Sequence, residues 1–438
     1  MKVCKFGGTS MATVQSIMTV KSIIERDSER KYVIVSAPGK RFSSDVKITD
    51  MLYSAYQEKF ETGACTHNIS LIRARFVELA KDLGLDIDMN KYIDEVEDGI
   101  LKSTTPDFAA SRGEYLSAII MSAVLGYDMV DAGDIIKFKH DGTFDSELTN
   151  DLVKKHCTNT KKGLVIPGFY GRMPDKSIKT FTRGGSDFTG AIIARGVGAK
   201  VYENWTDVNG FLVTDPRLVD KPKHIEVLSY EELRELSYMG ASVLHPDSIF
   251  PVQIDKIPIN IRNTFDPEHK GTLILASTKG FEIPKVTGIA GRKGNTTISL
   301  KKAMMNAEIG FCRKVLSVLE RNGLSVEHVP TGIDTMSIVL SDAGLKGVDE
   351  NKLIDDIRGA VNPDHIEITH SLALIAVVGH GMANSRGVAA TLFNALYKAG
   401  VNVRMIDQGS SELNIIVGVE EKDYNASIKA LYNAFFGC

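Results

Sequence analysis

The chain has 438 residues, and 52 lysine and arginine residues against 55 aspartate and glutamate residues give a formal net charge of −3. This balance excludes a protein that binds nucleic acid through a large basic surface, and 43% apolar with 24% charged residues excludes a disordered or collagen-like chain. At roughly 150 residues per domain, the length predicts about three domains.

The cysteines and the apolar segments give a first expectation about location. The five cysteines are an odd number, lie far apart and include no CxxC pair, which favours the reducing cytoplasm. Residues 1–8 contain no apolar run of signal-peptide length, and residues 373–378 are too few to cross a bilayer. We therefore expect a cytoplasmic protein without export or membrane anchoring.

Up to about residue 276, short runs typical of strands alternate with segments of helical period, as in a parallel sheet covered by helices on both faces. Apolar residues between positions 14 and 24 recur at near-helical spacing, so a helix is predicted between the first two strands. We expect a long helical region over residues 69–103, then a helix that begins near Pro106, carries Glu114 and ends near Leu125. The expected strands are residues 2–6, 32–35, 163–167 and 200–204.

The first expected strand leads into a glycine-rich turn, KFGGTS at residues 5–10. Glycines at the start of a helix bring bare N–H groups close to an anion, and phosphate is the natural occupant. The segment is neither a Walker A loop nor a GxGxxG turn. A strand-end turn with Lys5 facing solvent accounts equally well for this motif taken alone.

A second glycine motif, TRGGSD at residues 182–187, precedes the apolar helical segment 188–197. Two such helix N-termini supply N–H donors and partial positive charge, which suits a nucleotide triphosphate or a reacting phosphoryl group. Ser186 and Asp187 are also common helix caps, so capping is an alternative. Arg183 beside two glycines is harder to explain structurally.

A third polar cluster, residues 204–217, follows the expected strand at 200–204. The carboxyl ends of strands are where open parallel sheets bind ligands, so Asp207 and Arg217 are placed to meet a nucleotide. Turn-forming pairs such as Asn209-Gly210 leave a purely structural loop as the alternative. The histidines and acidic residues show no metal-binding spacing, and no metal site built by protein ligands alone is predicted.

The last third of the chain contains an internal repeat. Residues 310–341 align without gaps on residues 387–418, and each copy reads as helix, glycine, strand, turn and strand. Gly323 and Gly400 fall where a helix C-terminus needs a left-handed residue. We expect two small α+β domains after a boundary at residues 284–287.

Together these motifs resemble the aspartate kinase family over essentially the whole chain. The segments that carry the resemblance are KFGGTS at 5–10, KITD at 47–50, SRGEYLSA at 111–118, FTRGGSDFTG at 181–190, WTDVNGFLVTDPR at 205–217, EELRELSYMGASVLHP at 231–246 and the duplicated tail. The resemblance implies an α/β chain with an amino acid kinase domain over residues 1–280, a three-layer α/β/α sandwich. Two intertwined, ferredoxin-like α+β ACT domains would follow over residues 285–369 and 370–438.

The implied activity is transfer of the γ-phosphoryl group of ATP to the β-carboxylate of L-aspartate, giving 4-phospho-L-aspartate, the first step toward lysine, threonine and methionine. A carboxylate acceptor is already ionised near neutral pH and needs no general base, so positioning and charge neutralisation would supply most of the rate. The implied catalytic residues are Lys5 and Asp187, and Mg2+ would be held largely by ATP oxygens and water.

The resemblance also implies the substrate contacts. Ser242 departs from the family, which often has lysine there, and Leu212 stands where the family often has an aromatic residue. The implied aspartate contacts are Thr49, Glu114, Arg183 and Ser186, and the implied ATP contacts are Lys5, Gly7, Gly8, Gly184, Gly185, Thr206, Asp207, Leu212 and Arg217.

For the tail, the resemblance implies feedback control by lysine, threonine or both, and a homodimer or dimer of dimers formed through the ACT domains. Domains that only dimerise the enzyme are the alternative. A kinase of the same fold acting on glutamate, acetylglutamate or a nucleotide, and a catalytically silent amino-acid sensor, are the competing functions. The implied effector contacts are Met305, Gly310, Phe311, Cys312, Glu327 and Thr331, of which Glu327 is acidic, as an ammonium-binding position should be.

Overall fold

The chain divides into two compact units in the computed structural model, which describes residues 1–158, 160, 162–182, 184–241, 243–383 and 385–437. The first unit comprises residues 1–211, 226–230 and 242–280, and the second comprises residues 212–225, 231–241 and 281–438. Two segments from the middle of the sequence therefore belong to the same unit as the C-terminal part of the chain.

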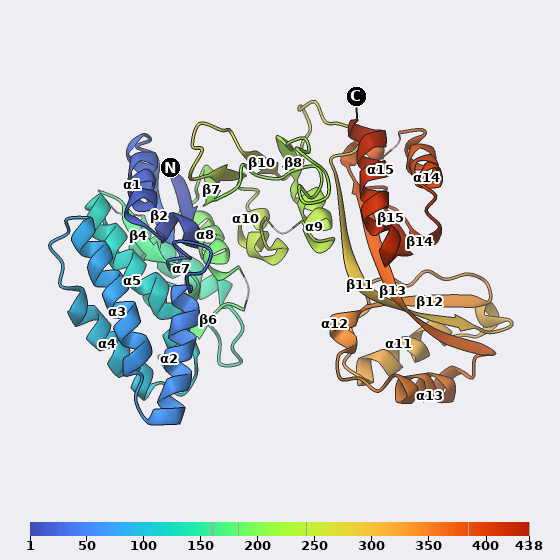
Figure 1. The fold of residues 1–438 in the computed structure, drawn as a ribbon, viewed down its shortest axis with the longest axis horizontal. Coiled ribbons are helices and arrows are strands. Elements are labelled where there is room, and N and C mark those ends of the chain that lie inside the picture. Colours follow the sequence, from blue (N-terminus) through green and yellow to red (C-terminus); the bar gives the residue numbers. More distant parts are fainter. Residues whose placement is uncertain (159, 161, 183, 242, 384, 438) are drawn as a thin grey trace. The chain divides into compact units, whose positions relative to one another are not determined.

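An eight-stranded sheet forms the centre of the first unit (Figure 1). Its order is β3-β4-β2-β1-β7-β9-β10-β8, and the four strands expected from the sequence are the adjacent β4, β2, β1 and β7. The expectation of a parallel sheet fails at β9 and β10, which pair antiparallel, because the short connection between them cannot hold a crossover. The strands are β1 (Lys2–Phe6), β2 (Arg30–Val35), β3 (Asp128–Met129), β4 (Leu164–Pro167), β7 (Val201–Thr206), β8 (Val227–Ser229), β9 (Ile259–Asn263) and β10 (Thr272–Leu275), beside a two-stranded sheet of β5 (Tyr170–Arg172) and β6 (Ile178–Thr180).

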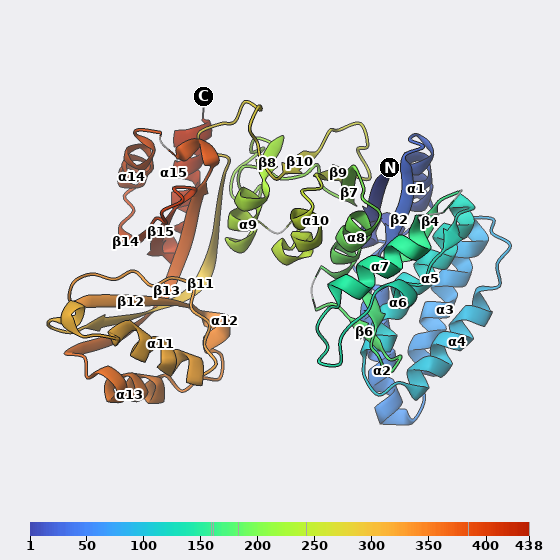
Figure 2. The same ribbon diagram turned by 180° about the vertical axis from the view of Figure 1, so that it is seen from behind.

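Helices cover both faces of this sheet (Figures 1 and 2). On one face, Phe6 and Val33 of the sheet share a core with the apolar sides of the first five helices, and on the other face α8 contacts β1 and β7 while α7 lies beside α8. The helices of this unit are α1 (Val14–Glu25), α2 (Ile48–Thr62), α3 (Thr66–Asp82), α4 (Met89–Lys102), α5 (Asp107–Leu125), α6 (Ala132–Ile135), α7 (Ser146–Cys157), α8 (Gly185–Gly196) and α10 (Phe250–Ile254), whereas α9 (Tyr230–Tyr238) belongs to the second unit except for its first residue.

The long helical region expected over residues 69–103 consists of two helices, α3 and α4. Gly84 lies between them with a φ of +67°, and the Asp88 side chain accepts a hydrogen bond from the Asn90 N–H at the start of α4. Helix α5 begins directly after Pro106 and ends at Leu125, as the sequence predicts, with Gly126 as its C-cap.

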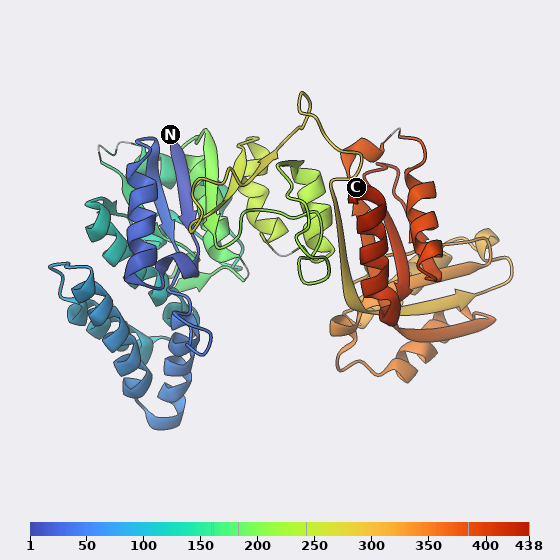
Figure 3. The same ribbon diagram turned by 45° about the horizontal axis from the view of Figure 1, so that its top comes forward.

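The second unit contains one five-stranded antiparallel sheet of order β12-β11-β13-β15-β14 (yellow to red in Figure 3). The repeat is visible in α11 and α14, whose first residues, 311 and 388, lie 77 positions apart. Strands β11 and β13 each span 14 residues, so both repeats share one sheet. The elements are β11 (Gly288–Lys301), α11 (Phe311–Arg321), β12 (Thr335–Ser341), α12 (Asp342–Leu345), α13 (Glu350–Val361), β13 (His365–Val378), α14 (Val388–Lys398), β14 (Val403–Asp407), β15 (Asn414–Glu420) and α15 (Tyr424–Phe436).

The glycines that end the first helix of each repeat adopt the expected conformation. Gly323 and Gly400 have φ values of +68° and +70°, and an added Cβ would strain the backbone at either position. Among the helices of the described residues, none combines the length and the apolar character that crossing a membrane requires.

Candidate active site

The two residues expected to act on phosphate meet where strands β1 and β7 end. Lys5 lies near the end of β1 and is 8% exposed, while Asp187 lies in the first turn of α8. The Lys5 Nζ atom is 2.7 Å from Asp187 Oδ1. A mostly buried ion pair therefore stands beside the N-terminus of α8, where helix N–H groups and the helix dipole favour an anion.

The backbone that follows Lys5 is tightly packed. The Gly7 N–H donates to the Trp205 carbonyl oxygen at 3.0 Å, so in this structure it is engaged at the end of the sheet. The Gly39 N–H donates to the Gly8 carbonyl oxygen at 2.8 Å, and a Cβ added to Gly8 would lie 2.9 Å from the Ala37 carbonyl oxygen. Gly8 therefore cannot carry a side chain without a shift of the backbone, and the roles of both glycines toward ATP stay predictions.

The N-terminus of α8 is built without a side-chain cap. Gly184 occupies the N-cap position with a φ of +57°, and no side chain caps the helix there. A Cβ on Gly185 would lie 2.4 Å from the Phe169 ring, so a residue with a side chain does not fit at this position. The alternative that Ser186 and Asp187 serve as plain helix caps is thus not what the structure shows. Arg183 lies outside the described residues.

Glu114 is buried in the middle of α5, where it is 6% exposed. Burial raises the pKa of its carboxyl group to about 8, and a hydrogen bond from the Ala37 backbone opposes this only in part. Its Oε2 atom is buried and has no hydrogen-bond partner among the described residues. Without a cation beside it, the buried carboxyl group favours its neutral form, and a cation would favour the ionised form. Thr49, another residue expected to contact aspartate, is partly buried in the first turn of α2.

Two residues that sequence reasoning missed hold Asp187 in place. Asn204 Nδ2 donates to Asp187 Oδ1 at 3.0 Å, and the Tyr202 hydroxyl donates to the Asp187 backbone carbonyl at 3.0 Å. Both come from β7, and the register of β7 beside β1 pairs Asn204 with Lys5. Strand alternation, which puts Tyr202 and Asn204 on one face of β7, is the sequence signal that could have identified them.

The loop between β2 and α2, residues 36–47, is fixed by the buried side chains of Arg75 and Asp45. Arg75 donates to the Gly39 and Val46 carbonyl oxygens, the latter at 2.9 Å. Asp45 forms a two-point ion pair with Arg41, whose hydrogen bonds lower the pKa of the Asp45 carboxyl group. These contacts hold Gly39 in place, and the Gly39 N–H in turn binds the Gly8 carbonyl oxygen.

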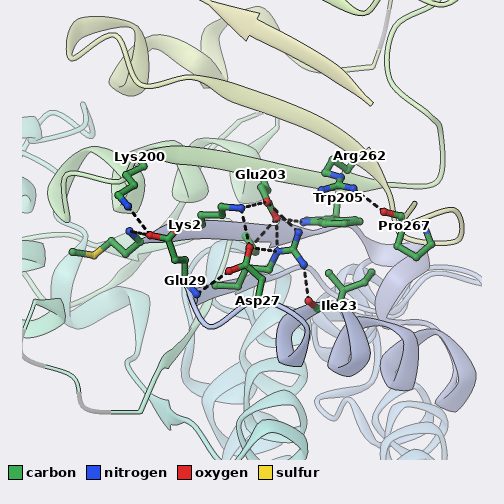
Figure 4. Close-up of polar contacts among 12 residues, drawn as sticks. Lys2, Ile23, Asp27, Glu29, Lys200, Glu203, Trp205, Arg262 and Pro267 are labelled. Atoms are coloured by element: carbon green, nitrogen blue, oxygen red, sulfur yellow. Dashed lines mark hydrogen bonds and ion pairs between the residues drawn. The ribbon is translucent and has the colours of Figure 1, made fainter. Parts of the chain in front are cut away.

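Behind the site, on the opposite face of β1 and β7, buried charges surround Glu203 (Figure 4). Its carboxylate accepts hydrogen bonds from Arg30 Nε at 2.9 Å and NH2 at 3.2 Å, and from Trp205 Nε1 at 2.9 Å. The Arg262 guanidinium lies 4.7 Å from the centre of the Trp205 ring. We call Arg30, Glu203, Trp205 and Arg262 the Glu203 cluster. It fixes the backbone of β7 at Trp205, whose carbonyl binds the Gly7 N–H.

The expected nucleotide contacts are divided between the two units. Thr206 ends β7, and its hydroxyl donates to Asp207 Oδ1 at 3.2 Å. Leu212 and Arg217 belong to the second unit, where Arg217 forms a two-point ion pair with Asp215 that includes an NH2 to Oδ2 distance of 2.6 Å. Ser242 lies outside the described residues.

The expected effector contacts lie in the second unit around α11. Met305 and Phe311 are buried, Gly310 is the N-cap of α11 with a φ of +82°, and Cys312 and Thr331 are exposed. Glu327 is held by two partners that the sequence did not predict: Arg292 NH2 lies 2.5 Å from its Oε2 atom, and the Tyr238 hydroxyl contacts the same carboxylate.

Within the described part of the chain, no group of three or more His, Cys, Asp or Glu residues is arranged to hold a metal ion. The side-chain contacts of the Asp187 carboxylate fall on one of its two oxygens. Lys5 Nζ and Asn204 Nδ2 both contact Oδ1, whereas Oδ2 forms no hydrogen bond among the described residues.

Comparison with known proteins adds an independent result. The model of the amino acid kinase family matches residues 1–263, and a model of the ACT domain matches residues 375–435. The chain is 36% identical to Aspartokinase 3 of Bacillus subtilis (strain 168), with 100% of this chain and 99% of that protein covered. It is 48% identical to the crystal structure of Clostridium acetobutylicum aspartate kinase, with a TM-score of 0.92 and 99% and 100% of the two chains covered. The structure of E. coli aspartokinase III in complex with aspartate and ADP, 24% identical with a TM-score of 0.79 and 100% of both chains covered, is similar in fold.

Proposed function

The chain belongs to the amino acid kinase family and, within it, to the aspartokinases, and we propose that it transfers the γ-phosphoryl group of ATP to the β-carboxylate of L-aspartate. The product is 4-phospho-L-aspartate. The observation that carries this proposal is the Lys5–Asp187 ion pair at the N-terminus of α8, in the same unit as Glu114, whose Oε2 atom has no hydrogen-bond partner among the described residues.

Lys5 supplies the positive charge for the transferring phosphoryl group. Phosphoryl transfer needs little covalent chemistry from the protein, and most of the rate comes from positioning and from neutralising charge on the phosphate oxygens. Lys5 is held by Asp187 in a mostly buried place, where its charge acts more strongly than in water. The acceptor carboxylate is already ionised near neutral pH and needs no base.

Mg2+ fits this site through one protein atom. Asp187 Oδ2 is the carboxylate oxygen that forms no hydrogen bond among the described residues, and Mg2+ usually keeps several waters and binds through one or two carboxylates together with substrate phosphates. When bound with ATP, the ion would neutralise charge on the phosphate oxygens. Asp187 would then hold Lys5 through Oδ1 and the ion through Oδ2.

Glu114 is proposed to bind the ammonium group of aspartate. Its Oε2 atom is buried and unpaired, and the pKa of its carboxyl group is raised to about 8 by burial. An ammonium group would satisfy that oxygen and favour the ionised form. Arg183 is proposed to bind a substrate carboxylate, with Thr49 and Ser186 as hydroxyl contacts, and Thr206, Asp207, Leu212 and Arg217 are proposed to contact ATP.

An acceptor assay tests the proposal. ADP release is measured with aspartate, glutamate and acetylglutamate in turn, each with ATP and Mg2+. Release that depends on aspartate alone supports the proposal. Release with glutamate or acetylglutamate and not with aspartate would favour a related amino acid kinase, and no release with any acceptor would favour a silent amino-acid sensor.

The second unit is proposed to regulate the enzyme. We infer two intertwined ACT domains, over residues 285–369 and 370–438, that follow a catalytic domain over residues 1–280 and form a homodimer or a dimer of dimers. The ACT match at residues 375–435 and the shared sheet support this inference. Lysine, threonine or both would bind at Glu327, whose acidic side chain suits an ammonium group. We also propose that the enzyme acts in the cytoplasm at the start of lysine, threonine and methionine synthesis.

A further inference from the structure

Asn204 shares an oxygen atom of Asp187 with Lys5. The two residues are register partners on the neighbouring strands β7 and β1. Asn204 Nδ2 lies 3.0 Å from Asp187 Oδ1, and Lys5 Nζ lies 2.7 Å from the same atom. Asn204 is 3% exposed, so its carboxamide is fixed inside the unit. One oxygen therefore receives both a charged and a neutral donor.

This arrangement matters when Lys5 acts on phosphate. If the ammonium group moves from Asp187 toward a phosphate oxygen, it leaves a mostly buried carboxylate oxygen, and an unpaired oxygen of that kind is costly. The Asn204 carboxamide keeps Oδ1 paired throughout that movement. Because an amide is neutral, it does so without competing with the phosphate for Lys5, as a second carboxylate would.

We propose that Asn204 is a positioning residue for phosphoryl transfer, which pairs Asp187 Oδ1 so that Lys5 is free to follow the phosphate and Oδ2 stays directed to the ligand. The proposal rests on the aspartate kinase function proposed above. Asn204 acts only through the Asp187 side chain and contacts no substrate itself.

Tyr202 provides the matched comparison. It comes from the same strand and reaches the same residue, but its hydroxyl donates to the Asp187 backbone carbonyl. It fits because Gly190 has no side chain: a Cβ there would lie 2.4 Å from the Tyr202 hydroxyl. Tyr202 therefore holds the backbone of the first turn of α8, whereas Asn204 holds the Asp187 carboxylate.

The test is a double-mutant cycle with Asp187→Ala, with kcat and both KM values as readouts. Asn204→Leu has nearly the same shape but no donor, and we expect kcat to fall roughly 10- to 100-fold while the KM values for ATP and aspartate change less than about threefold. In the Asp187→Ala background the same substitution should change kcat less than about twofold, because the oxygen that Asn204 pairs is gone. Tyr202→Phe should change kcat by the same factor in both backgrounds.

Two results would overturn the proposal: a wild-type kcat in Asn204→Leu, or an equal loss in both backgrounds, which is what a merely structural role gives. If Asn204→Leu does not fold, as judged by thermal unfolding, Asn204→Asp replaces it. The carboxylate added in Asn204→Asp competes for Lys5, so this variant should lose at least as much kcat as expected for Asn204→Leu. A wild-type kcat in Asn204→Asp would therefore also reject the positioning role of Asn204. Wild-type protein without aspartate-dependent turnover would reject the proposed function itself, whereas active wild type with additive variants would reject only Asn204.

Discussion

Lys5 on strand β1 and Asp187 on helix α8 form a 2.7 Å ion pair at the end of the two central strands of the first sheet. Both side chains are mostly buried, and a buried ion pair contributes little net stability because desolvation offsets the attraction. A pair of this kind at a helix N-terminus is better explained by chemistry on an anion than by folding.

Replacing Lys5 with methionine should abolish most of the catalytic rate. We expect kcat to fall at least about 100-fold, because the charge that offsets the developing phosphate charge is lost, while the KM for aspartate changes little. Steady-state kinetics measure both constants. Lys2→Met is the matched control on the same strand, since Lys2 pairs with Asp27 and Glu203 behind the sheet and should leave kcat near the wild-type value. An unchanged kcat in Lys5→Met would reject its catalytic role.

Glu114 should make aspartate binding depend on pH. Its carboxyl group, with a pKa raised to about 8, is mostly neutral at pH 6 in the free enzyme and ionised at pH 9. Because only the ionised form pairs with an ammonium group, the KM for aspartate should fall as the pH rises across this range. Glu114→Gln should raise that KM roughly 10-fold or more at pH 9 and remove the pH dependence. A pH-dependent KM in Glu114→Gln would contradict this assignment.

The same residue should affect stability in the free enzyme. A pKa higher in the folded than in the unfolded state means that the folded protein binds more protons between the two values, so the free energy of unfolding falls as the pH rises through about 8. Thermal unfolding of Glu114→Gln should show a flatter dependence between pH 6 and 9. Parallel curves for wild type and variant would show that Glu114 is not the group responsible.

The Glu203 cluster should be important for stability. Arg30→Met removes one partner of a buried pair and leaves Glu203 uncompensated, so we expect a loss of about 3–5 kcal/mol in the free energy of unfolding. Urea unfolding measures this loss. The control is Glu29→Gln, which removes exposed contacts with Lys200 and the N-terminus (Figure 4) and should leave the urea midpoint nearly unchanged. Similar midpoints for the two variants would show that burial of the Arg30 pair does not matter.

Glu327 should carry the response to the effector. Its carboxylate is held by Arg292 and Tyr238, so an ammonium ligand must compete with these partners. In Glu327→Gln we expect the concentration of lysine or threonine that halves activity to rise roughly 10-fold or more, with kcat unchanged in their absence. Inhibition curves with lysine, threonine and both together measure this. Wild-type inhibition in Glu327→Gln would place the effector elsewhere, and no inhibition of the wild type would reject feedback by these two amino acids.

Local sequence signals predicted much of this structure. Strands β1, β2, β4 and β7, helix α5 and the repeated helices α11 and α14 follow from period, glycine placement and Pro106. The antiparallel β9–β10 pair and the single sheet shared by both repeats depend on pairing between strands, which no local pattern specifies.

In the candidate site, too, local sequence patterns predicted some residues but not those whose roles depend on contacts between strands and helices. Lys5, Glu114 and Asp187 were predicted because they stand in recognisable motifs. Asn204 and Tyr202 were missed because their roles depend on contacts across the sheet, and burial of Glu203 could not be foreseen from a charged residue in a short strand.

The reaction product tests the central claim most directly. Wild-type protein is incubated with ATP, Mg2+ and L-aspartate in the presence of hydroxylamine, which traps an acyl phosphate as a hydroxamate that mass spectrometry can assign to one carboxyl group. We predict aspartate β-hydroxamate in an amount equal to the ADP released, and none when aspartate or ATP is omitted. ADP release without β-hydroxamate, or hydroxamate on the α-carboxyl group, would contradict the account.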